Sequence, residues 1–168
     1  MHVLHLLRHT KSSWDDDTLA DHERPLSRRG VRDAGRMAEH LRSEARPDLV
    51  LCSSAVRTRQ TLDLIAPTLG SPSIQIEDGL YGASSQALLS RLHEVPESIG
   101  ALLMLGHNPG IEDLALRLAA PGAIREQVTV KYPTGALATL ALDGHAWADL
   151  SDGSAELTGF TIPRNLRG

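Results

Sequence analysis

Three short apolar runs in this chain lead into residues that can bind or attack a phosphoryl group. The runs and the residues after them are 3–7 followed by Arg8 and His9, 49–52 followed shortly by Arg57, and 101–105 followed by His107. A guanidinium binds phosphate oxygens through two parallel hydrogen bonds and keeps its charge at neutral pH. A neutral imidazole in line with phosphorus is a competent nucleophile. Together the four residues indicate a site that binds a phosphoryl group and breaks its bond.

The arginines would hold the phosphoryl group while a histidine attacks it. Arg8 and Arg57 would offset the charge that grows in the transition state, and removing one such preorganised donor typically costs about 3–4 kcal/mol of barrier stabilisation. Positive charge nearby lowers the pKa of a histidine and keeps its ring neutral. His9 follows its apolar run directly beside Arg8, so we assign it as the nucleophile.

His107 lies in the turn GHNPG, in front of a segment with helical periodicity. Glycines permit tight backbone geometry, and a helix N-terminus favours an anion. We expect His107 to hydrogen-bond a phosphoryl oxygen and to act as an electrophile. The turn alone is equally consistent with a histidine that caps the helix, and the other three residues favour the catalytic interpretation.

The alternation of apolar runs with helical segments predicts a fold that would bring these residues together. A near-continuous apolar run is typical of a buried parallel strand, and ligands of open α/β sheets bind beyond the carboxyl ends of the strands. We therefore predict a single three-layer α/β domain over residues 1–168, with a mostly parallel central sheet flanked by helices and no cap domain. The expected strands are residues 3–7, 49–52, 74–76, 101–105, 128–132, 136–142 and 156–162, of which at least one late strand is an antiparallel edge.

Helices are expected from about residue 27, over 55–69 and 85–93, and after the GHNPG turn. Ser27 can cap the first of them, and Pro67 should end the second early. The first helix should bury residues that recur at spacings of three and four, namely Val31, Ala34, Ala38 and Leu41. Its arginines should face solvent, with Arg28 or Arg29 able to reach an anionic ligand.

Composition limits the classes of function. A formal charge of −4 over 168 residues argues against nonspecific nucleic-acid binding, and no segment is long and apolar enough for a membrane span. A single cysteine and the lack of a signal peptide favour a cytoplasmic protein. Cys52 is either a reactive thiol or, more in keeping with its apolar run, a small buried side chain. The acidic triplet 15–17 is either a set of metal ligands or a solvated turn, and the spacing of the acidic residues favours the turn.

Four segments in this order, LLRHTKSSWDD, RPLSRRG, SSAVRTRQT and LGHNPGIEDLA, resemble the histidine phosphatase superfamily. The resemblance runs from about residue 6 to residue 142 and is greatest to the short SixA-type branch, the phosphohistidine phosphatases. It implies a transient phosphohistidine on His9 and phosphate binding by Arg8, Arg57 and His107, with help from Ser12. It implies no metal and no organic cofactor. Thr10 departs from the glycine or alanine that usually follows the histidine.

A proton donor for the leaving group is the least defined part of this site. Larger branches of the superfamily carry a glutamate after the third strand, and Asp78 or Glu77 lies in about that region. We name Asp78 as the catalytic acid, with a plain loop carboxylate as the alternative. Asp15 and Glu112 are weaker candidates. An alkoxide leaving group needs such an acid, whereas the nitrogen of a phosphoramidate can take its proton from solvent.

The expected function is therefore that of a metal-independent phosphatase acting on phosphohistidine in a partner protein. The short chain between residues 77 and 101 leaves no room for a cap, and an uncovered pocket suits a phosphorylated side chain of another protein. The alternatives are a general phosphomonoesterase for small phosphorylated substrates and a phosphate-binding module without catalysis. The sequence specifies neither the partner nor the oligomeric state.

Overall fold

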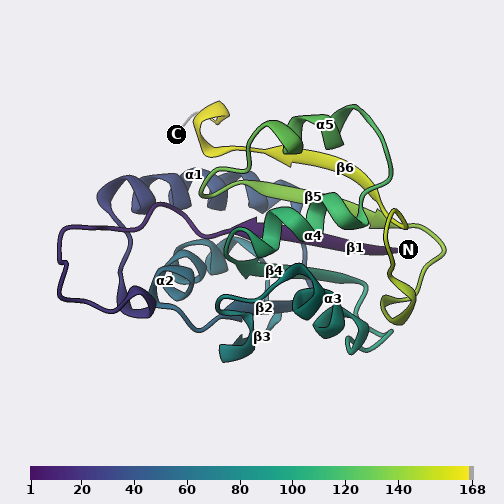
Figure 1. Ribbon diagram of the computed structural model, residues 1–168, viewed down its shortest axis with the longest axis horizontal. Helices are drawn as coiled ribbons and strands as arrows, with labels where there is room; N and C mark the ends of the chain where they lie inside the picture. The colour runs from purple at the N-terminus through teal and green to yellow at the C-terminus, as the bar shows by residue number, and fades with distance from the viewer. Residues whose placement is uncertain (167–168) are drawn as a thin grey trace.

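The computed structural model describes residues 1–166 and shows one six-stranded sheet between two layers of helices (Figure 1). The strand order is β3-β2-β4-β1-β5-β6. The strands are β1 (His2–Arg8), β2 (Leu49–Ser53), β3 (Ser73–Glu77), β4 (Ala101–Gly106), β5 (Leu137–Leu142) and β6 (Glu156–Thr161). The helices are α1 (Arg28–Glu44), α2 (Val56–Ile65), α3 (Ser85–His93), α4 (Gly110–Leu118) and α5 (Ala123–Val130), with short 3-10 turns between several elements.

The first four strands are parallel, so their carboxyl ends meet at one edge of the sheet. β4 pairs with both β1 and β2, and β3 lies outside β2. β5 runs antiparallel to β1, and β6 runs antiparallel to β5 as the edge strand. β6 consequently ends at the same edge as β1. The predicted α/β fold with a mostly parallel sheet is confirmed, including the late antiparallel strand.

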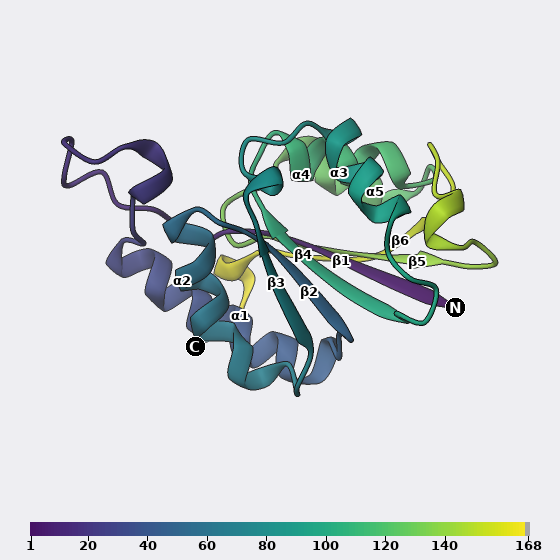
Figure 2. The same cartoon turned by 90° about the horizontal axis from the view of Figure 1, so that it is seen from below.

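Each face of the sheet has its own apolar core. α1 and α2 cover one face and α3, α4 and α5 cover the other (Figure 2). Successive side chains of a strand point to opposite faces. Leu6 of β1 therefore packs in the core on the α3–α4 side, and Leu7 packs in the core against α1 and α2. Residues buried on both faces explain why β1, β2 and β4 read as continuous apolar runs.

Helix α1 begins as predicted and buries a slightly different face. The Ser27 hydroxyl accepts a hydrogen bond from the backbone N–H of Gly30, which is the expected N-cap. Ala34, Ala38 and Leu41 are buried, but Val31 is 48% exposed, so its predicted burial is wrong. The buried stripe instead passes through Gly30, Asp33 and Met37, because the first turn packs its glycine against the backbone after β1.

The segment from residue 128 to residue 132 was expected to be a strand and is the end of helix α5 and the residues after it. Its β-branched residues favour a strand by propensity, but tertiary packing decides. Val128 is fully buried in the core, and the side chain of Arg125 donates two hydrogen bonds to the Leu116 carbonyl, which fixes α5 against α4. The other expected strands are present, and α2 ends before Pro67, as predicted.

No helix among residues 1–166 is both long enough and apolar enough to cross a membrane.

Candidate active site

The carboxyl ends of β1, β2 and β4, with the segments that follow them, bring the four predicted residues to one place. These three strands are adjacent and parallel, so the residues that follow them share one edge of the sheet. The ring centroids of His9 and His107 are 5.2 Å apart. Arg57 Nε lies 3.3 Å from His9 Nε2. Arg57, His9 and His107 are each less than 9% exposed.

The hydrogen bond of His9 fixes the tautomer that a nucleophile needs. Nδ1 lies 2.7 Å from the backbone carbonyl of Thr10. A carbonyl only accepts, so Nδ1 carries the proton and Nε2 carries the free lone pair. The Nε–H of Arg57 donates to that lone pair. The nucleophilic atom is therefore held beside a guanidinium that can bind an oxygen of an incoming phosphoryl group.

Arg57 is held from the other side by the loop after β1. Its NH1 donates to the Asp21 carbonyl at 2.7 Å and its NH2 to the Asp21 carboxylate at 3.0 Å. Tyr81 donates its hydroxyl proton to the same carboxylate oxygen at 2.6 Å. These charge-assisted bonds orient the guanidinium plane, and they leave its Nε on the side of His9.

His107 and Arg8 each carry a buried N–H group that lacks a partner. His107 Nε2 lies 2.7 Å from the Ser53 hydroxyl, whose own oxygen accepts from the Ala55 N–H. Within residues 1–166 the Ser53 hydroxyl has no other acceptor, so we assign its proton to the bond with Nε2, which places the proton of neutral His107 on Nδ1. Within residues 1–166, His107 Nδ1 and Arg8 Nε are buried without a hydrogen-bond partner. Buried polar groups are almost always paired, so two orphaned donors indicate a site for an acceptor such as a phosphoryl oxygen.

Both histidines are kept neutral. Burial is the largest cause and lowers the pKa of His9 to about 3, to which His107, Arg57 and Arg8 also contribute. Burial likewise lowers the pKa of His107 to about 4, followed by the charge of Arg57. From the sequence, the lowered histidine pKa was attributed to neighbouring positive charge, whereas burial is the larger cause for both histidines. At neutral pH His9 Nε2 therefore carries a lone pair, which accepts from Arg57 here and becomes free for attack once a phosphoryl oxygen takes that Arg57 N–H.

Comparison with known proteins agrees with this arrangement. The family model "Histidine phosphatase superfamily (branch 1)" matches residues 4–98. The chain belongs to the histidine phosphatase superfamily. An uncharacterized protein of Mycobacterium tuberculosis is 39% identical over 163 residues, which is 94% of this chain and 100% of that protein.

Solved structures place the chain beside SixA-type members of the superfamily. A Nakamurella multipartitia protein assigned as a phosphohistidine phosphatase SixA is 32% identical, has a TM-score of 0.85, and each chain covers 96% of the other. The similarly assigned Agrobacterium tumefaciens protein is 28% identical with a TM-score of 0.82, over 96% of this chain and 98% of that one. The predicted resemblance to the SixA-type branch is confirmed.

Within residues 1–166, neither Ser12 nor Asp78 forms a side-chain hydrogen bond with the four central residues. The Ser12 hydroxyl accepts a hydrogen bond of 2.8 Å from Arg24 NH2. Asp78 begins the 3-10 turn after β3 and its residue is exposed, with its backbone carbonyl accepting from Tyr81 N–H. The roles of Ser12 in phosphate binding and of Asp78 as an acid stay predictions.

The other carboxylates considered as acids have partners or lie outside the site. Arg91 donates to both oxygens of Glu77 at 2.8 and 2.9 Å. Glu112 accepts from the Asn108 side chain at 3.2 Å. Asp15 is exposed in the projecting loop between β1 and α1. Within residues 1–166, no group of three His, Cys, Asp or Glu side chains forms a candidate metal site, the acidic triplet included.

Sequence reasoning missed two residues of the candidate active site, Asp21 and Tyr81. Asp21 lies in the long loop after β1, and nothing in its local sequence distinguishes it from the acidic residues around it. The Asp21 carboxylate is only slightly buried. The hydrogen bond that it accepts from Tyr81, followed by those from Arg57, lowers the pKa of Asp21 to about 2. Tyr81 follows the end of β3, and its ring lies 5.4 Å from that of His107. The strand-end rule that identified the histidines also applies to Tyr81.

Cys52 is a buried structural side chain. It is fully buried at the end of β2, and burial raises the pKa of its thiol to about 12. A protonated thiol is a poor nucleophile. The prediction of a small buried side chain is therefore favoured over that of a reactive cysteine.

Proposed function

We propose that this phosphatase removes phosphoryl groups from phosphohistidine in a partner protein, through a covalent intermediate on His9 and without a metal ion. The observation that carries the proposal is the His9 ring itself, neutral and buried, with its Nε2 lone pair 3.3 Å from the Arg57 guanidinium. A module that only bound phosphate would need the arginines but no oriented nucleophile.

The reaction is two displacements at phosphorus. In the first, the lone pair of His9 Nε2 forms a bond to phosphorus while the P–N bond to the substrate breaks, and the leaving nitrogen takes a proton from solvent. Arg8, Arg57 and the Nδ1–H of His107 would bind the phosphoryl oxygens as their charge grows. In the second, water attacks phosphorus and loses a proton to solvent while the Nε2–P bond breaks, and its electron pair returns to Nε2, which releases phosphate and restores neutral His9.

The surroundings of Arg57 support a phosphoramidate substrate over a phosphate ester. Asp21 is the carboxyl group bonded to Arg57, and with a pKa of about 2 it is ionised at neutral pH and has no proton to donate. Glu77, the alternative to Asp78 after β3, is bound to Arg91. An alkoxide leaving group requires a donor, worth about 10²–10⁴-fold in rate, while an imidazole nitrogen leaves readily once solvent protonates it.

The lack of a cap domain also favours a protein substrate. Between β3 and β4 the chain forms a 3-10 turn and the single helix α3, so this connection carries no cap domain. The loop between β1 and α1 extends outward beyond the carboxyl ends of the strands, and its Asp21 contacts Arg57 (Figure 1). A protein substrate would therefore meet loops rather than a cap domain at this edge.

The direct test compares substrates on the purified protein, with and without chelator. We expect kcat/KM for a phosphohistidine peptide to exceed that for aryl and sugar phosphates by at least about 100-fold, and to be unchanged by chelation. Faster hydrolysis of the esters, with a selective loss in Asp78→Asn, would show a general phosphomonoesterase that uses Asp78 as its acid. Loss of activity on chelation would show that a metal takes part.

A further inference from the structure

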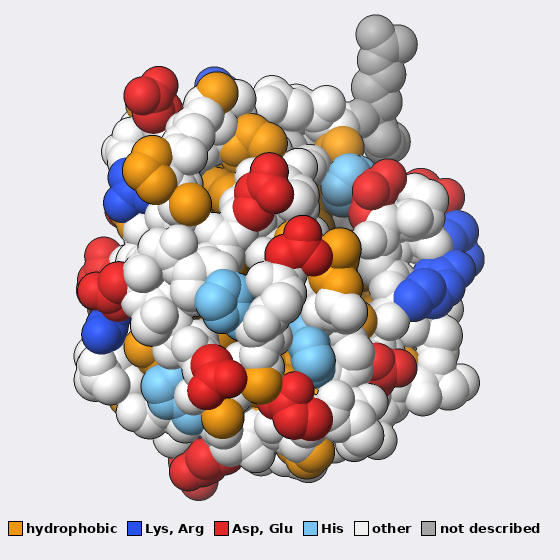
Figure 3. Space-filling view, turned by 90° about the vertical axis from the view of Figure 1, so that its right-hand side faces the viewer, with side chains coloured by type: hydrophobic (Ala, Val, Ile, Leu, Met, Phe, Trp, Pro, Cys, Tyr) orange, Lys and Arg blue, Asp and Glu red, His pale blue; other side chains and the backbone are white. Residues whose placement is uncertain are grey.

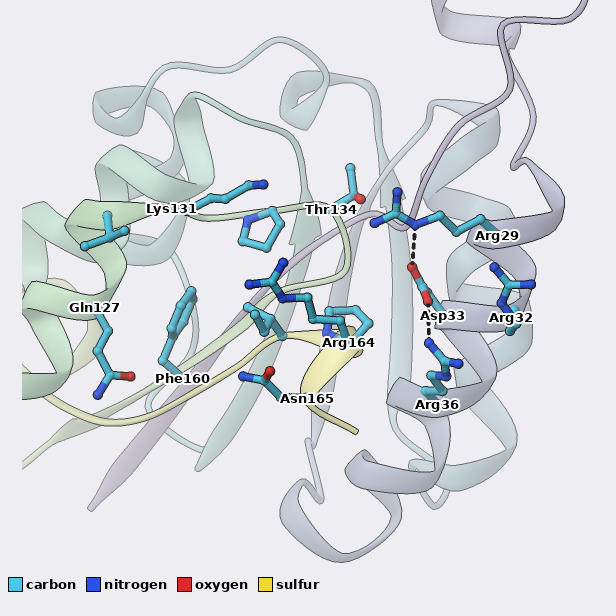
Figure 4. Close-up of a pocket in the computed structure, with 14 residues that line it drawn as sticks. Arg29, Arg32, Asp33, Arg36, Gln127, Lys131, Thr134, Phe160, Arg164 and Asn165 are labelled. Carbon is cyan, nitrogen blue, oxygen red and sulfur yellow. Dashed lines mark hydrogen bonds and ion pairs between the residues drawn. The ribbon is translucent and has the colours of Figure 1, made fainter. Parts of the chain in front are cut away.

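A second pocket lies at the same end of the sheet as His9 and has no role in the reaction described above. It is a hollow of about 440 Å³ between α1 on one side and α5 with the end of β6 on the other (Figure 4). Its size falls within the range of ligand sites. Its cationic lining residues are Arg29, Arg32, Arg36, Lys131 and Arg164, and its apolar wall includes Pro133, Phe160, Ile162 and Pro163.

The charge of this basic pocket is opposite to that of the whole protein. Five cationic side chains and one carboxylate, Asp33, line the pocket of a chain whose formal net charge is −4. Asp33 is buried and is shared between Arg29 at 3.5 Å and Arg36 at 3.3 Å. At the opposite end of the molecule, acidic side chains are scattered across the surface (Figure 3). The basic pocket is therefore a local concentration of positive charge on a protein of net negative charge.

Several cationic side chains of the basic pocket have no hydrogen-bond or ion-pair partner among residues 1–166. Within residues 1–166, the side chains of Arg32, Lys131 and Arg164 take part in no hydrogen bond or ion pair. Arg36 Nε is buried and has no hydrogen-bond partner in the same part of the chain. Cations held together without counter-charges raise the local potential and attract an anionic ligand. Arginine in particular matches the planar geometry of a carboxylate.

One loop borders both the basic pocket and the active site. Lys131, Pro133 and Thr134 line the pocket. The next residue, Gly135, donates its N–H toward the carbonyls of Arg8 at 3.0 Å and His9 at 2.9 Å. The segment 131–135 therefore lines the pocket along most of its length and contacts the backbone of Arg8 and His9 at its end.

The strand register gives the separation between the two sites. Leu7 of β1 pairs with Leu137 of β5, which pairs with Thr161 of β6. The pocket residues Ile162 and Pro163 therefore follow β6 at the level where Arg8 and His9 follow Leu7. Two strand spacings amount to about 10 Å. An extended peptide covers at most about 3.3–3.6 Å per residue, so about three residues bridge this distance.

We propose that the basic pocket binds an acidic segment of the phosphoprotein substrate, with carboxylates about three to six residues from the phosphohistidine. This inference rests on the proposed function. The pocket would favour acidic substrates over neutral ones at the binding step, and it would offset the repulsion between such a partner and the net negative charge of this chain. The backbone of a peptide can connect the active site and the basic pocket, whereas a small metabolite would have to occupy both sites at once. A peptide is therefore the favoured ligand.

The test uses two phosphohistidine peptides of equal length, one with Glu at these positions and one with Gln, together with phosphoramidate, which is too small to reach the pocket. We expect the protein to prefer the Glu peptide by about tenfold in kcat/KM, through KM, and to lose the preference in Arg32→Glu/Arg164→Glu. Both residues are exposed, so the reversal leaves the cores intact. Hydrolysis of phosphoramidate should be unchanged.

A control reverses the same amount of charge at two other exposed arginines, in Arg42→Glu/Arg59→Glu, and should keep the preference. Equal rates on both peptides in the unmodified protein, with phosphoramidate hydrolysed, would overturn the pocket proposal and leave the proposed function standing. Loss of preference in the control would overturn it as well, because general charge would then be the cause. Hydrolysis of phosphate esters alone, with no activity on either peptide or on phosphoramidate, would overturn both proposals.

Discussion

At the scale of single residues, the site depends on how each donor is oriented. His9 is a nucleophile because its other ring nitrogen is tied to the Thr10 carbonyl. Arg57 is useful because Asp21 holds two of its nitrogens while the third faces His9. A point charge at the same place would not reproduce this arrangement, since a lysine carries no planar fork.

The substitution Arg57→Lys tests this view. We expect kcat to fall by about 10²–10³-fold, since one preorganised donor to the transition state and the contact with His9 Nε2 are lost together. Arg59→Lys is the matched control, because Arg59 is exposed on the same helix, and it should stay within about twofold of the unmodified protein. Steady-state rates with phosphoramidate give the measurement. Full activity in Arg57→Lys would show that only the charge matters.

The four central residues could be predicted from the sequence, but the residues that hold them in position could not. Arg8, His9, Arg57 and His107 follow apolar runs, and strand ends of a parallel sheet meet at one edge. Asp21 comes from a long loop whose path no local pattern specifies, and only its contacts with Arg57 and Tyr81 distinguish it.

At the scale of elements, glycine positions decide how close α1 can approach the segment after β1. A Cβ added at Gly30 would lie 2.0 Å from the Lys11 carbonyl oxygen, so the helix can pack there only because this residue has no side chain. Five residues further along the same helix, a Cβ at Gly35 would meet nothing within 4 Å. The two glycines thus have opposite consequences for stability.

We expect Gly30→Ala to lower the free energy of unfolding by about 2 kcal/mol or more, because the backbone must move to relieve the clash. Gly35→Ala should raise the free energy of unfolding by about 0.5–1 kcal/mol, since alanine stabilises an exposed helical position more than glycine does. Denaturant unfolding at pH 7 measures both. Effects of the same sign in the two variants would contradict the described packing of α1.

Most elements could be predicted because their apolar patterns follow directly from burial on one or both faces. The error at residues 128–132 arose where local preference and tertiary packing disagree. Val128 and Val130 suggest a strand, yet one is fully buried in the core and the other is 85% exposed on a helix that α4 holds in place. Val31 is a similar case at the first turn of α1, where Gly30 takes the contact instead.

At the scale of the whole molecule, buried neutral histidines link stability to pH. Burial lowers the pKa of His5 and of His107 to about 4 and that of His9 to about 3. In the unfolded chain each would titrate near 6.5. As the pH falls below 6.5, the unfolded chain gains protons that the folded protein cannot take up. Their stabilising contribution is therefore full above pH 6.5 and is lost toward pH 4.

We expect the free energy of unfolding to fall between pH 6.5 and 4.5 with a slope of about 1.4 kcal/mol per pH unit for each of these histidines. His5→Asn should reduce the slope by one such increment and leave activity intact, because His5 lies outside the site and bonds Thr139. Denaturant titrations at several pH values in this window give the slope. A stability that does not change with pH there would show that these histidines titrate normally.

Phosphate trapping on the enzyme tests the central claim most directly. The protein is mixed with a radiolabelled phosphohistidine peptide, quenched in alkali to preserve phosphoramidate bonds, and mapped by mass spectrometry. The account predicts label on Nε2 of His9 and neither label nor turnover in His9→Ala. Label on another residue, or full activity in His9→Ala, would contradict it.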